Sequence, residues 1–552
     1  MTTPTTFHWT AEISGMTCDA CERHVARAVE ETGGSDVSAS WHEGTATFNA
    51  AGIDEAALGA AVHDAGYEVG EIRRLGDLQA VTSGGDVDWD LAIIGSGSAA
   101  FAAAIKATEA GARVVMVEKG TPGGTCVNVG CVPSKALLVA AEAHHRGRSH
   151  DFAGVAHIAG GQPDLGAIVD QKDELVGGRR QAKYLDLIDD YGFTLRHGTA
   201  RFVDADTISV DDEPLRAANY LIATGARPAL PPIEGLDAVD YLTSTSALAL
   251  TTVPARLAVV GANAIGLELG QAFAHLGADV TFLDIAERVA PFEEPEISGA
   301  LTDGLVGEGA HVVTGAQIKR VSQAADGTVT IEGDLANLGS TLTVDRVLVA
   351  TGRAPNTAEL NLVAAGVGVD RRGFVVVDEF LRTTNTRVWA AGDVTASPQF
   401  VYVSASEGAI VADNAISGTG RRTDYRVLPR VIFTTPQVAA VGLTEAQAEG
   451  AGFDVITSVL PLAYVPRAIV NRDTRGLIKL VADRTTDRLL GVHVLAEGAG
   501  EVIQAGVYAL MAGLTTTEIA GAFHPYLTMA EGLKLAAQTF HRDAAKLSCC
   551  AA

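Results

Sequence analysis

The chain has 552 residues, of which 47% are apolar and 20% are charged. This length predicts about three or four domains with cores of their own, and the composition excludes a chain that is disordered throughout. The 41 basic and 67 acidic residues give a net charge of −26. Because such a surface repels phosphate backbones and anionic lipid, neither nucleic acid nor a membrane is expected as a partner.

No secretion signal or membrane-spanning segment is expected. The amino-terminal residues lack the basic stretch and apolar core of a signal peptide. The most apolar stretch, residues 91–105, is interrupted by Gly95 and Gly97 and is shorter than the about 20 residues of a spanning helix. It predicts a buried strand followed by a helix, in a soluble protein of the cytoplasm.

Residues 8–72 are predicted to form a small domain of their own. Their apolar patterns predict the order strand, helix, strand, strand, helix, strand, which is typical of a ferredoxin-like βαββαβ fold. The clearest segments are the strands at 8–13 and 46–48 and the helices at 24–31 and 55–65. Glycine and serine in residues 73–87 predict a flexible linker.

Two stretches of the main body repeat a dinucleotide-binding pattern. Each has an apolar strand, a turn of small residues, a helix, and a second strand that leads to an acid 23 positions after the first glycine. The residues of the two patterns are Gly95, Gly97, Ala100 and Glu118, then Gly261, Gly266 and Asp284. The small residues let the backbone approach a pyrophosphate, and the carboxylate accepts from ribose hydroxyls. Asn263 replaces the second glycine of the second turn.

The six cysteines fall into three close pairs, Cys18 with Cys21, Cys126 with Cys131, and Cys549 with Cys550. This spacing is unlike that of a secreted disulfide scaffold and favours thiol redox chemistry or soft-metal binding. The central pair follows the first dinucleotide-binding pattern, and a helix beginning near Pro133 would lower a thiolate pKa. The alternative, two buried structural cysteines, is disfavoured by the glycines, proline and lysine around the pair.

Residues 88–552 resemble the pyridine nucleotide-disulfide oxidoreductases, a family of FAD-containing dimers. The matching landmarks are GGTCVNVGCVPSK at 123–135, ATG at 223–225, ATGR at 350–353 and AGDV at 391–394. The resemblance implies an α/β fold in which the first turn holds FAD and the second holds NAD(P)H. The implied parts are two Rossmann-like domains, for FAD at 88–226 with 354–426 and for NAD(P)H at 227–353, and an α+β dimerisation domain at 427–552.

The carboxyl-terminal end departs from the family members that reduce disulfides. Dihydrolipoamide dehydrogenase and glutathione reductase carry a catalytic histidine five residues before a glutamate. Here Tyr526 stands at that spacing before Glu531, and His524 lies two positions earlier. The vicinal thiols at 549–550 favour capture of a soft metal ion, the alternative being an incidental oxidisable pair.

The segment Gly15–Cys21 resembles the metal-binding loop of heavy-metal-associated domains. Alone, a CxxC sequence also occurs in redox motifs and as half of a zinc site, but no second ligand pair completes a zinc site here. Together the resemblances imply a mercury-reducing member of the family. Thiol-bound Hg(II) would be reduced to volatile Hg(0) with electrons from NADPH or NADH, through FAD and the Cys126/Cys131 pair.

The resemblance also implies a role for each cysteine pair. The amino-terminal pair would scavenge Hg(II), the carboxyl-terminal pair of the partner subunit would deliver it, and the central pair would hold it beside the flavin. Tyr241 and Tyr526 match tyrosines that line the family's metal site, with aromatic packing as the alternative for Tyr241. The further residues implied to bind the cofactors are Gly120, Thr125, Lys135, Ala200, Glu268, Asp393 and Val401.

Asp284 predicts that NADH is used at least as well as NADPH, because a carboxylate accepts from a free ribose hydroxyl and repels a 2′-phosphate. Two other functions stay open. One is a dihydrolipoamide dehydrogenase-like disulfide reductase with an accessory metal-binding domain, which would turn over lipoamide or glutathione disulfide. The other is a metal chaperone, which would bind metal without metal-dependent oxidation of NAD(P)H.

Overall fold

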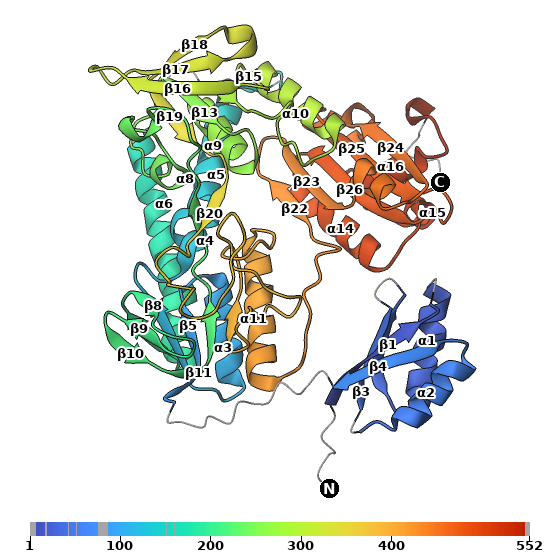
Figure 1. The fold of residues 1–552 in the computed structure, drawn as a ribbon. Helices are drawn as coiled ribbons and strands as arrows, with labels where there is room; N and C mark the ends of the chain where they lie inside the picture. The colour runs from blue at the N-terminus through green and yellow to red at the C-terminus, as the bar shows by residue number, and fades with distance from the viewer. Residues whose placement is uncertain are drawn as a thin grey trace. The chain divides into compact units, whose positions relative to one another are not determined.

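The computed structural model describes residues 7–16, 19–41, 44–50, 52–74, 87–150, 152–158 and 161–546. The chain divides into two compact units. The first unit comprises residues 1–124, 182–226 and 355–423, and the second comprises residues 125–181, 227–354 and 424–552. Each unit is therefore assembled from segments that lie far apart in the sequence, as the colours of Figure 1 show.

The amino-terminal segment of the first unit is a four-stranded sheet with two helices. Its elements are β1 (Phe7–Ser14), α1 (Asp19–Glu31), β2 (Ser35–Ser40), β3 (Thr45–Ala50), α2 (Glu55–Asp64) and β4 (Glu68–Arg74). The strands pair antiparallel in the order β2-β3-β1-β4, and Val25 and Leu58 of the helices pack with Phe48 of the sheet. The predicted order of elements is observed. Strand β4 includes the first two residues of the predicted linker, whose residues 75–86 lie outside the described part.

A parallel sheet forms the body of the first unit, in the order β21-β11-β5-β6-β7. Its strands are β5 (Trp89–Ile94), β6 (Val114–Glu118), β7 (Thr194–His197), β11 (Ala217–Ile222) and β21 (Val388–Ala390). Helix α3 (Ser98–Glu109) packs tightly on α11 (Val401–Ser417). Glycine at position 408 allows this close approach, since a Cβ there would overlap the Ala99 carbonyl. The strand and helix predicted within residues 91–105 are thus confirmed.

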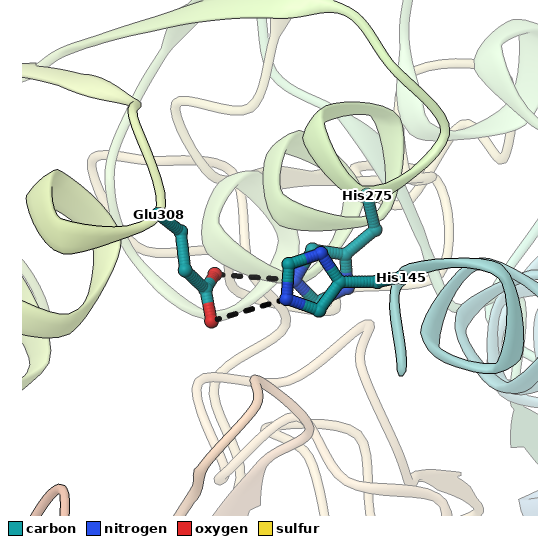
Figure 2. Close-up of side chains that lie close together, drawn as sticks. All are labelled: His145, His275 and Glu308. Atoms are coloured by element: carbon teal, nitrogen blue, oxygen red, sulfur yellow. Dashed lines mark hydrogen bonds and ion pairs between the residues drawn. The ribbon is translucent and has the colours of Figure 1, made fainter. Parts of the chain in front are cut away.

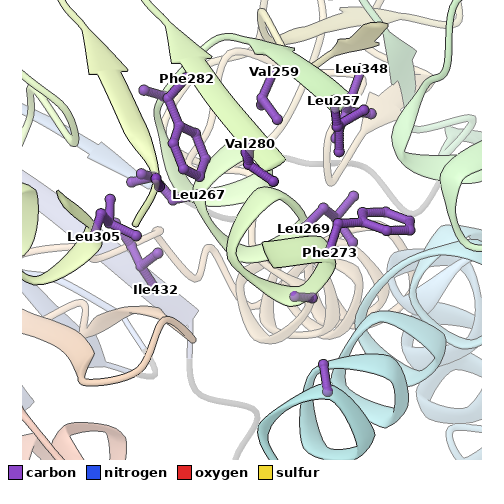
Figure 3. Close-up of a cluster of buried hydrophobic side chains, with 14 of the residues drawn as sticks. Leu257, Val259, Leu267, Leu269, Phe273, Val280, Phe282, Leu305, Leu348 and Ile432 are labelled. Atoms are coloured by element: carbon purple, nitrogen blue, oxygen red, sulfur yellow. The ribbon is translucent and has the colours of Figure 1, made fainter. Parts of the chain in front are cut away.

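A second parallel sheet, in the order β15-β14-β13-β19, forms the core of the second unit. Its strands are β13 (Arg256–Val260), β14 (Asp279–Leu283), β15 (His311–Val313) and β19 (Arg346–Val349), and α9 (Ala264–His275) lies between β13 and β14 in the chain. Figure 3 shows Leu257 and Val259 of the sheet and Phe273 of this helix in one hydrophobic core.

The segment 125–181 belongs to the second compact unit, and the predicted bounds of the FAD-binding domain stay a prediction. It forms α5 (Cys131–Arg148) and α6 (Leu165–Arg180), which pack against one another, and α5 also packs against α9. The reason is burial: Leu137 and Leu165 lie in the same hydrophobic core as Phe273. A helix is placed by the surface that covers its apolar face, and that surface was not visible in the local sequence.

The carboxyl-terminal part of the second unit is an antiparallel sheet in the order β22-β23-β26-β25-β24. Its strands are β22 (Arg430–Ile432), β23 (Gln437–Gly442), β24 (Val455–Pro461), β25 (Leu477–Asp483) and β26 (Leu489–Ala496). Helices α14 (Ala499–Met511) and α16 (Glu531–Gln538) pack on it, with Val502 and Leu533 buried in its core. This is the α+β arrangement expected of the segment.

The remaining elements connect these layers. The strands are β8 (Ala200–Phe202), β9 (Ile208–Val210), β10 (Glu213–Leu215), β12 (Ala226–Pro228), β16 (Gln317–Gln323), β17 (Val329–Asp334), β18 (Thr341–Val344) and β20 (Arg353–Pro355). The helices are α4 (Gly124–Val129), α7 (Asp186–Tyr191), α8 (Ser244–Ala247), α10 (Pro295–Gly307), α12 (Glu445–Gly450), α13 (Pro466–Asn471) and α15 (Thr516–Gly521). A π-helical turn lies at Gln181–Leu185, and short 3₁₀ turns lie at Leu236–Ala238, Ala336–Leu338, Leu462–Tyr464 and Ala544–Lys546.

One stretch of the described residues, Gly124–Arg148, is long and apolar enough to cross a membrane by length and composition alone. It consists of α4 and α5, with Gly130 between them. A single stretch of this kind is weak support for a membrane span, because core helices of soluble proteins meet the same criteria.

Candidate functional site

The first glycine-rich turn of the main body, between β5 and α3, is shaped by close backbone contacts. Gly95 has φ +108°, and a Cβ there would overlap the carbonyl of Ala223. A Cβ at Gly124 would lie 2.5 Å from the Cα of Gly97. A Cβ at Gly97 itself would meet only the Gly124 Cα, at 3.9 Å, so the turn has the open backbone that a pyrophosphate requires at a helix N-terminus.

Glu118 ends β6 beside this turn. One of its carboxylate oxygens accepts from the Ser96 hydroxyl and the other from the Gly120 amide, each at 2.6 Å. Its side chain is half-buried. The bond to Gly120 holds the acid at the end of the strand, where a ribose would be bound.

The second turn, between β13 and α9, has the same construction with a tighter third position. A Cβ at Gly261 would lie 2.5 Å from the Ala350 carbonyl oxygen, and a Cβ at Gly266 would overlap the carbonyl of Gly261. Asn263, which replaces a glycine of the pattern, has φ −111° and therefore needs none of the freedom of glycine.

Asp284 follows β14 and closes this second turn. Its carboxylate accepts from the Ala262 amide at 2.5 Å and from the Ala286 amide at 2.8 Å. The neighbouring Ile285 is 78% exposed, so the carboxylate stands at the solvent-facing end of the strand. This is the position from which an acid can accept from the ribose of a dinucleotide.

The central cysteine pair lies on two consecutive helices. Cys126 is within α4, which was not predicted, and Cys131 is the first residue of α5. The helix predicted to begin near Pro133 thus begins two residues earlier. Proline is tolerated in a first turn because the amide it lacks has no intrahelical partner there. A Cβ at Gly130, between the two helices, would lie 2.9 Å from the Thr125 carbonyl oxygen.

The two thiols are unequal in acidity. The pKa of Cys131 is lowered to about 7, first by a hydrogen bond from Cys126 and further by the positive charge of Lys135. The same interaction raises the pKa of Cys126. Both thiols are free. Cys131 is therefore the thiol of the pair that ionises more readily, and Cys126 is the thiol that donates to it.

Lys135 and Glu268 join the cysteine-bearing helix to the second dinucleotide fold. The Lys135 ammonium lies 2.7 Å from a Glu268 oxygen and 4.4 Å from the centre of the Phe433 ring. The other Glu268 oxygen accepts from the Phe433 amide at 2.9 Å, and the Glu268 side chain is only 8% exposed. Sequence reasoning missed Phe433, because no local pattern marks a residue so far along the chain.

Arg180, at the end of α6, was also missed. Its guanidinium donates to the Asn128 side chain at 3.1 Å, and Asn128 lies in α4 between the two cysteines. The contact holds the cysteine-bearing turn against α6. Nothing in the sequence around Arg180 predicted it, since the two residues are 52 positions apart.

The other residues expected at the FAD site have different surroundings. Asp393 is half-buried just after β21, and the preceding Gly392 amide donates to the buried Glu407 at 2.6 Å. Ala200 is buried in the hydrophobic core of the first unit. Thr125 is exposed, and Val401 is 36% exposed as the first residue of α11.

The two tyrosines lie in separate parts of the second unit. Tyr241 packs, half-buried, against the core around Leu236, whereas Tyr526 is 58% exposed between α15 and α16. Glu531 accepts from the Leu527 amide at 3.2 Å, and the imidazole of His524 lies 3.2 Å from the Ala522 carbonyl oxygen. In this chain Glu531 therefore braces a turn, and the contacts described for it include no imidazole.

Of the terminal cysteine pairs, only Cys21 is described. It lies half-buried in α1 and packs at the edge of the amino-terminal core. The predicted metal-binding residues Cys18, Cys549 and Cys550 lie outside the described residues.

Comparison with known proteins agrees with this geometry. Residues 89–408 match the family described as pyridine nucleotide-disulphide oxidoreductase, and residues 428–537 match the dimerisation domain of the same family. The chain is 49% identical to a mercuric reductase of Lysinibacillus sphaericus, over 98% of each chain. It is 52% identical to a mercuric reductase of Streptomyces lividans, over 84% of this chain and 98% of the relative.

A solved structure gives the same result for the fold. The Cu(II) complex of the HOCl-induced flavoprotein disulfide reductase RclA from Escherichia coli superposes with a TM-score of 0.74 at 32% identity, over 82% of this chain and 99% of that one. The two dinucleotide folds, the cysteine pair that follows the first of them in the chain and the matched sequences lead to one conclusion. The chain belongs to the pyridine nucleotide-disulphide oxidoreductase family.

Proposed function

We propose that the chain reduces thiol-bound Hg(II) to Hg(0) with electrons from NAD(P)H, the activity for which its relatives are named. The observation that carries the proposal is the unequal cysteine pair. Cys131 is the more acidic thiol, with a pKa of about 7, Cys126 is its hydrogen-bond donor, and paired thiolates select soft metal ions. Near-full-length identity of 49% to a mercuric reductase supports the substrate.

The first turn fits FAD. A Cβ at Gly97 would meet only the Gly124 Cα, at 3.9 Å, so the backbone of this turn is open to a pyrophosphate, and Glu118 is placed to accept from a ribose. When bound there, FAD supplies the chemistry of accepting hydride from NAD(P)H and passing two electrons to the metal held by the thiols. Glu118, Gly120, Thr125, Lys135 and Asp393 would hold the cofactor, together with Ala200 and Val401.

Within the second unit, Lys135 has two roles. Its charge favours the Cys131 thiolate, and its bond to Glu268 anchors α5 to α9, the helix that begins at the NAD(P)H-binding turn. The pair thereby links the position of the reactive thiols to the position of the nicotinamide dinucleotide. Because the thiol pair can bind the metal by ligand exchange, no free ion needs to be released.

The outer cysteine pairs would carry Hg(II) to this site. The amino-terminal segment, with its βαββαβ order of elements, suits a ferredoxin-like metal-binding domain that takes Hg(II) at Cys18 and Cys21. Cys549 and Cys550, from the partner subunit of a homodimer, would pass the ion to the central pair. Tyr241 and Tyr526 would line the metal's path. We place the enzyme in the cytoplasm, where small thiols bind Hg(II).

The disulfide reductase alternative is not favoured. Such an enzyme needs an imidazole to move a proton at the leaving thiol, and Tyr526 stands where the family's histidine would be. Glu531, the usual partner of that histidine, is engaged with the Leu527 amide.

The choice of dinucleotide is proposed to follow from Asp284. Its two oxygens already accept from two backbone amides, and its remaining lone pairs suit the hydroxyls of NADH. Removal of the charge in Asp284→Asn should raise the efficiency ratio of NADPH to NADH by about tenfold. An exposed acid of α10 gives the control variant Asp303→Asn. An unchanged ratio in Asp284→Asn, with NADPH equal or better in both proteins, would refute the proposal.

One experiment tests the function itself. Purified FAD-loaded protein in excess small thiol is given HgCl₂, while NADH and NADPH absorbance is followed and volatile mercury is trapped. Oxidation that depends on Hg(II), with mercury leaving as vapour, is the expected result. Mercury that is bound without any dinucleotide being consumed would instead identify a metal chaperone.

A further inference from the structure

Two imidazoles and a carboxylate meet at the far end of the cysteine-bearing helix. His145 is in the last turn of α5, His275 is the last residue of α9, and Glu308 directly follows α10. Figure 2 shows both rings turned toward the Glu308 carboxylate. The His275 Nε2 lies 3.1 Å from one of its oxygens and the His145 Nε2 lies 3.9 Å from the other.

The spacing of these atoms is near that of a metal site. One ligand atom from each residue lies within 4.8 Å of the others. In a tetrahedral site with metal–ligand bonds of about 2.0–2.1 Å, the ligand atoms are about 3.3 Å apart. The group is also protected from solvent, since the side chains of His275, Glu308 and His145 are 4%, 9% and 23% exposed.

We propose that His145, His275 and Glu308 form a binding site for a divalent cation of borderline softness, such as Zn²⁺ or Co²⁺. Imidazole and carboxylate ligands favour these ions, whereas Hg²⁺ prefers thiolates. A cation at this site would tie α5, which begins at Cys131, to α9 and to the end of α10. The site is separate from the cysteine pair, which lies at the opposite end of α5.

Two features of the structure set the cost of binding. The two rings are stacked, with centroids 4.0 Å apart and planes at 13°, and an ion cannot lie in the planes of two parallel rings. His145, the more exposed of the two, must therefore rotate. Arg475 lies 2.5 Å from Glu308 and competes with the cation, but it keeps Asp473 as a partner at 2.8 Å when it leaves.

Co²⁺ titration of the full-length, FAD-loaded protein tests the site, because thiolate ligands give a sulfur-to-cobalt charge-transfer band and nitrogen and oxygen ligands do not. We expect one Co²⁺ equivalent whose visible bands lack that sulfur signature. It should be lost in His145→Gln and kept in His144→Gln, whose imidazole lies 3.5 Å from Arg148 of its own helix.

Removal of the competing charge gives the sharpest signature. Arg475→Gln should tighten Co²⁺ binding by about tenfold, since a like charge next to a ligand has an effect of this order. The proposal would be overturned if every bound Co²⁺ showed the sulfur charge-transfer band. It would also be overturned if the Co²⁺ bound without that band were still present in His145→Gln. Weaker binding in Arg475→Gln would overturn it as well. These spectra do not depend on turnover, so they stand whatever the outcome of the Hg(II) assay.

Discussion

The two dinucleotide-binding turns share one sequence pattern but differ in their backbone contacts. In both, the first glycine lies against a carbonyl of a neighbouring strand end, Ala223 for Gly95 and Ala350 for Gly261. The third position differs. Ala100 is fully buried in the first turn, whereas any Cβ at Gly266 would overlap a backbone carbonyl in the second. The helix of the second turn therefore begins closer to its own turn, and the same motif does not tolerate the same residues.

The acids of the two turns differ as well. Glu118 is held by a serine hydroxyl and an amide, while Asp284 is held by two amides. The shorter Asp284 is bound to the turn itself through Ala262. The first turn also leads into the cysteine pair, and the second leads into none. Chemistry and dinucleotide binding are thus separable by mutation.

The largest expected effect separates the thiol chemistry from dinucleotide binding. Cys126→Ser should lower Hg(II)-dependent oxidation of NAD(P)H by at least about 10³-fold, because removing one member of a reactive unit removes nearly all its activity. Binding of NADH, measured by fluorescence quenching, should be unchanged, since the second turn is untouched. Substantial turnover in Cys126→Ser would show that Hg(II) reduction does not need both thiols of the pair.

Gly266→Ala tests the tighter third position. The added Cβ would overlap the Gly261 carbonyl, and overpacking of this kind costs about 1–3 kcal/mol. The Kd for NADH should rise between about fivefold and 100-fold while FAD content stays normal. Gly304→Ala is the matched control, because a Cβ there meets nothing within 4 Å. Equal NADH affinity in the two variants would show that the third position of the second turn tolerates a Cβ, as that of the first turn does.

Glu118→Gln tests the first acid. Loss of the charge weakens its bonds to Ser96 and Gly120, and charge-assisted hydrogen bonds are about twice as strong as neutral ones. The Kd for FAD, measured by reconstitution of the apoprotein, should rise about tenfold. Glu109→Gln, at the exposed end of α3, should leave it unchanged. If both variants bound FAD equally, Glu118 would serve only to brace the turn.

Lys135→Met should give the smallest change. Because the Lys135 charge lowers the pKa of Cys131, which is about 7, its removal should raise that pKa by about one unit. The rate of alkylation by iodoacetamide, followed against pH in the reduced protein, reports the thiolate directly. Lys106→Met, whose ammonium pairs with Asp413 instead, is the control. A midpoint that stays near pH 7 in Lys135→Met would leave Cys126 as the sole cause.

The sequence predicted most of what is local. Both strand–turn–helix units, the αβ order of the amino-terminal segment and the central thiol pair follow from neighbouring residues. The helix predicted near Pro133 is observed and begins at Cys131, whereas the short helix α4 before it was not expected. Capping and burial decide such ends, and a few residues of sequence contain neither.

Long-range contacts could not be predicted. Glu268 was found only through the family, and its partner Phe433 was missed, because they are 165 positions apart. The same holds for His145 in α5, His275 in α9 and Glu308, which directly follows α10. None of these three has a neighbour in sequence that signals a shared site.

By itself, the sequence determined the chemistry that this chain carries: two glycine turns with their acids, and thiols in pairs. These depend on residue type and short spacing, which the backbone translates directly into local geometry. Only the tertiary structure decided that α5 belongs to the second unit and that Lys135 meets Glu268. Burial of apolar faces brings distant segments together, and the electrostatics of a site arise from the neighbours so gained.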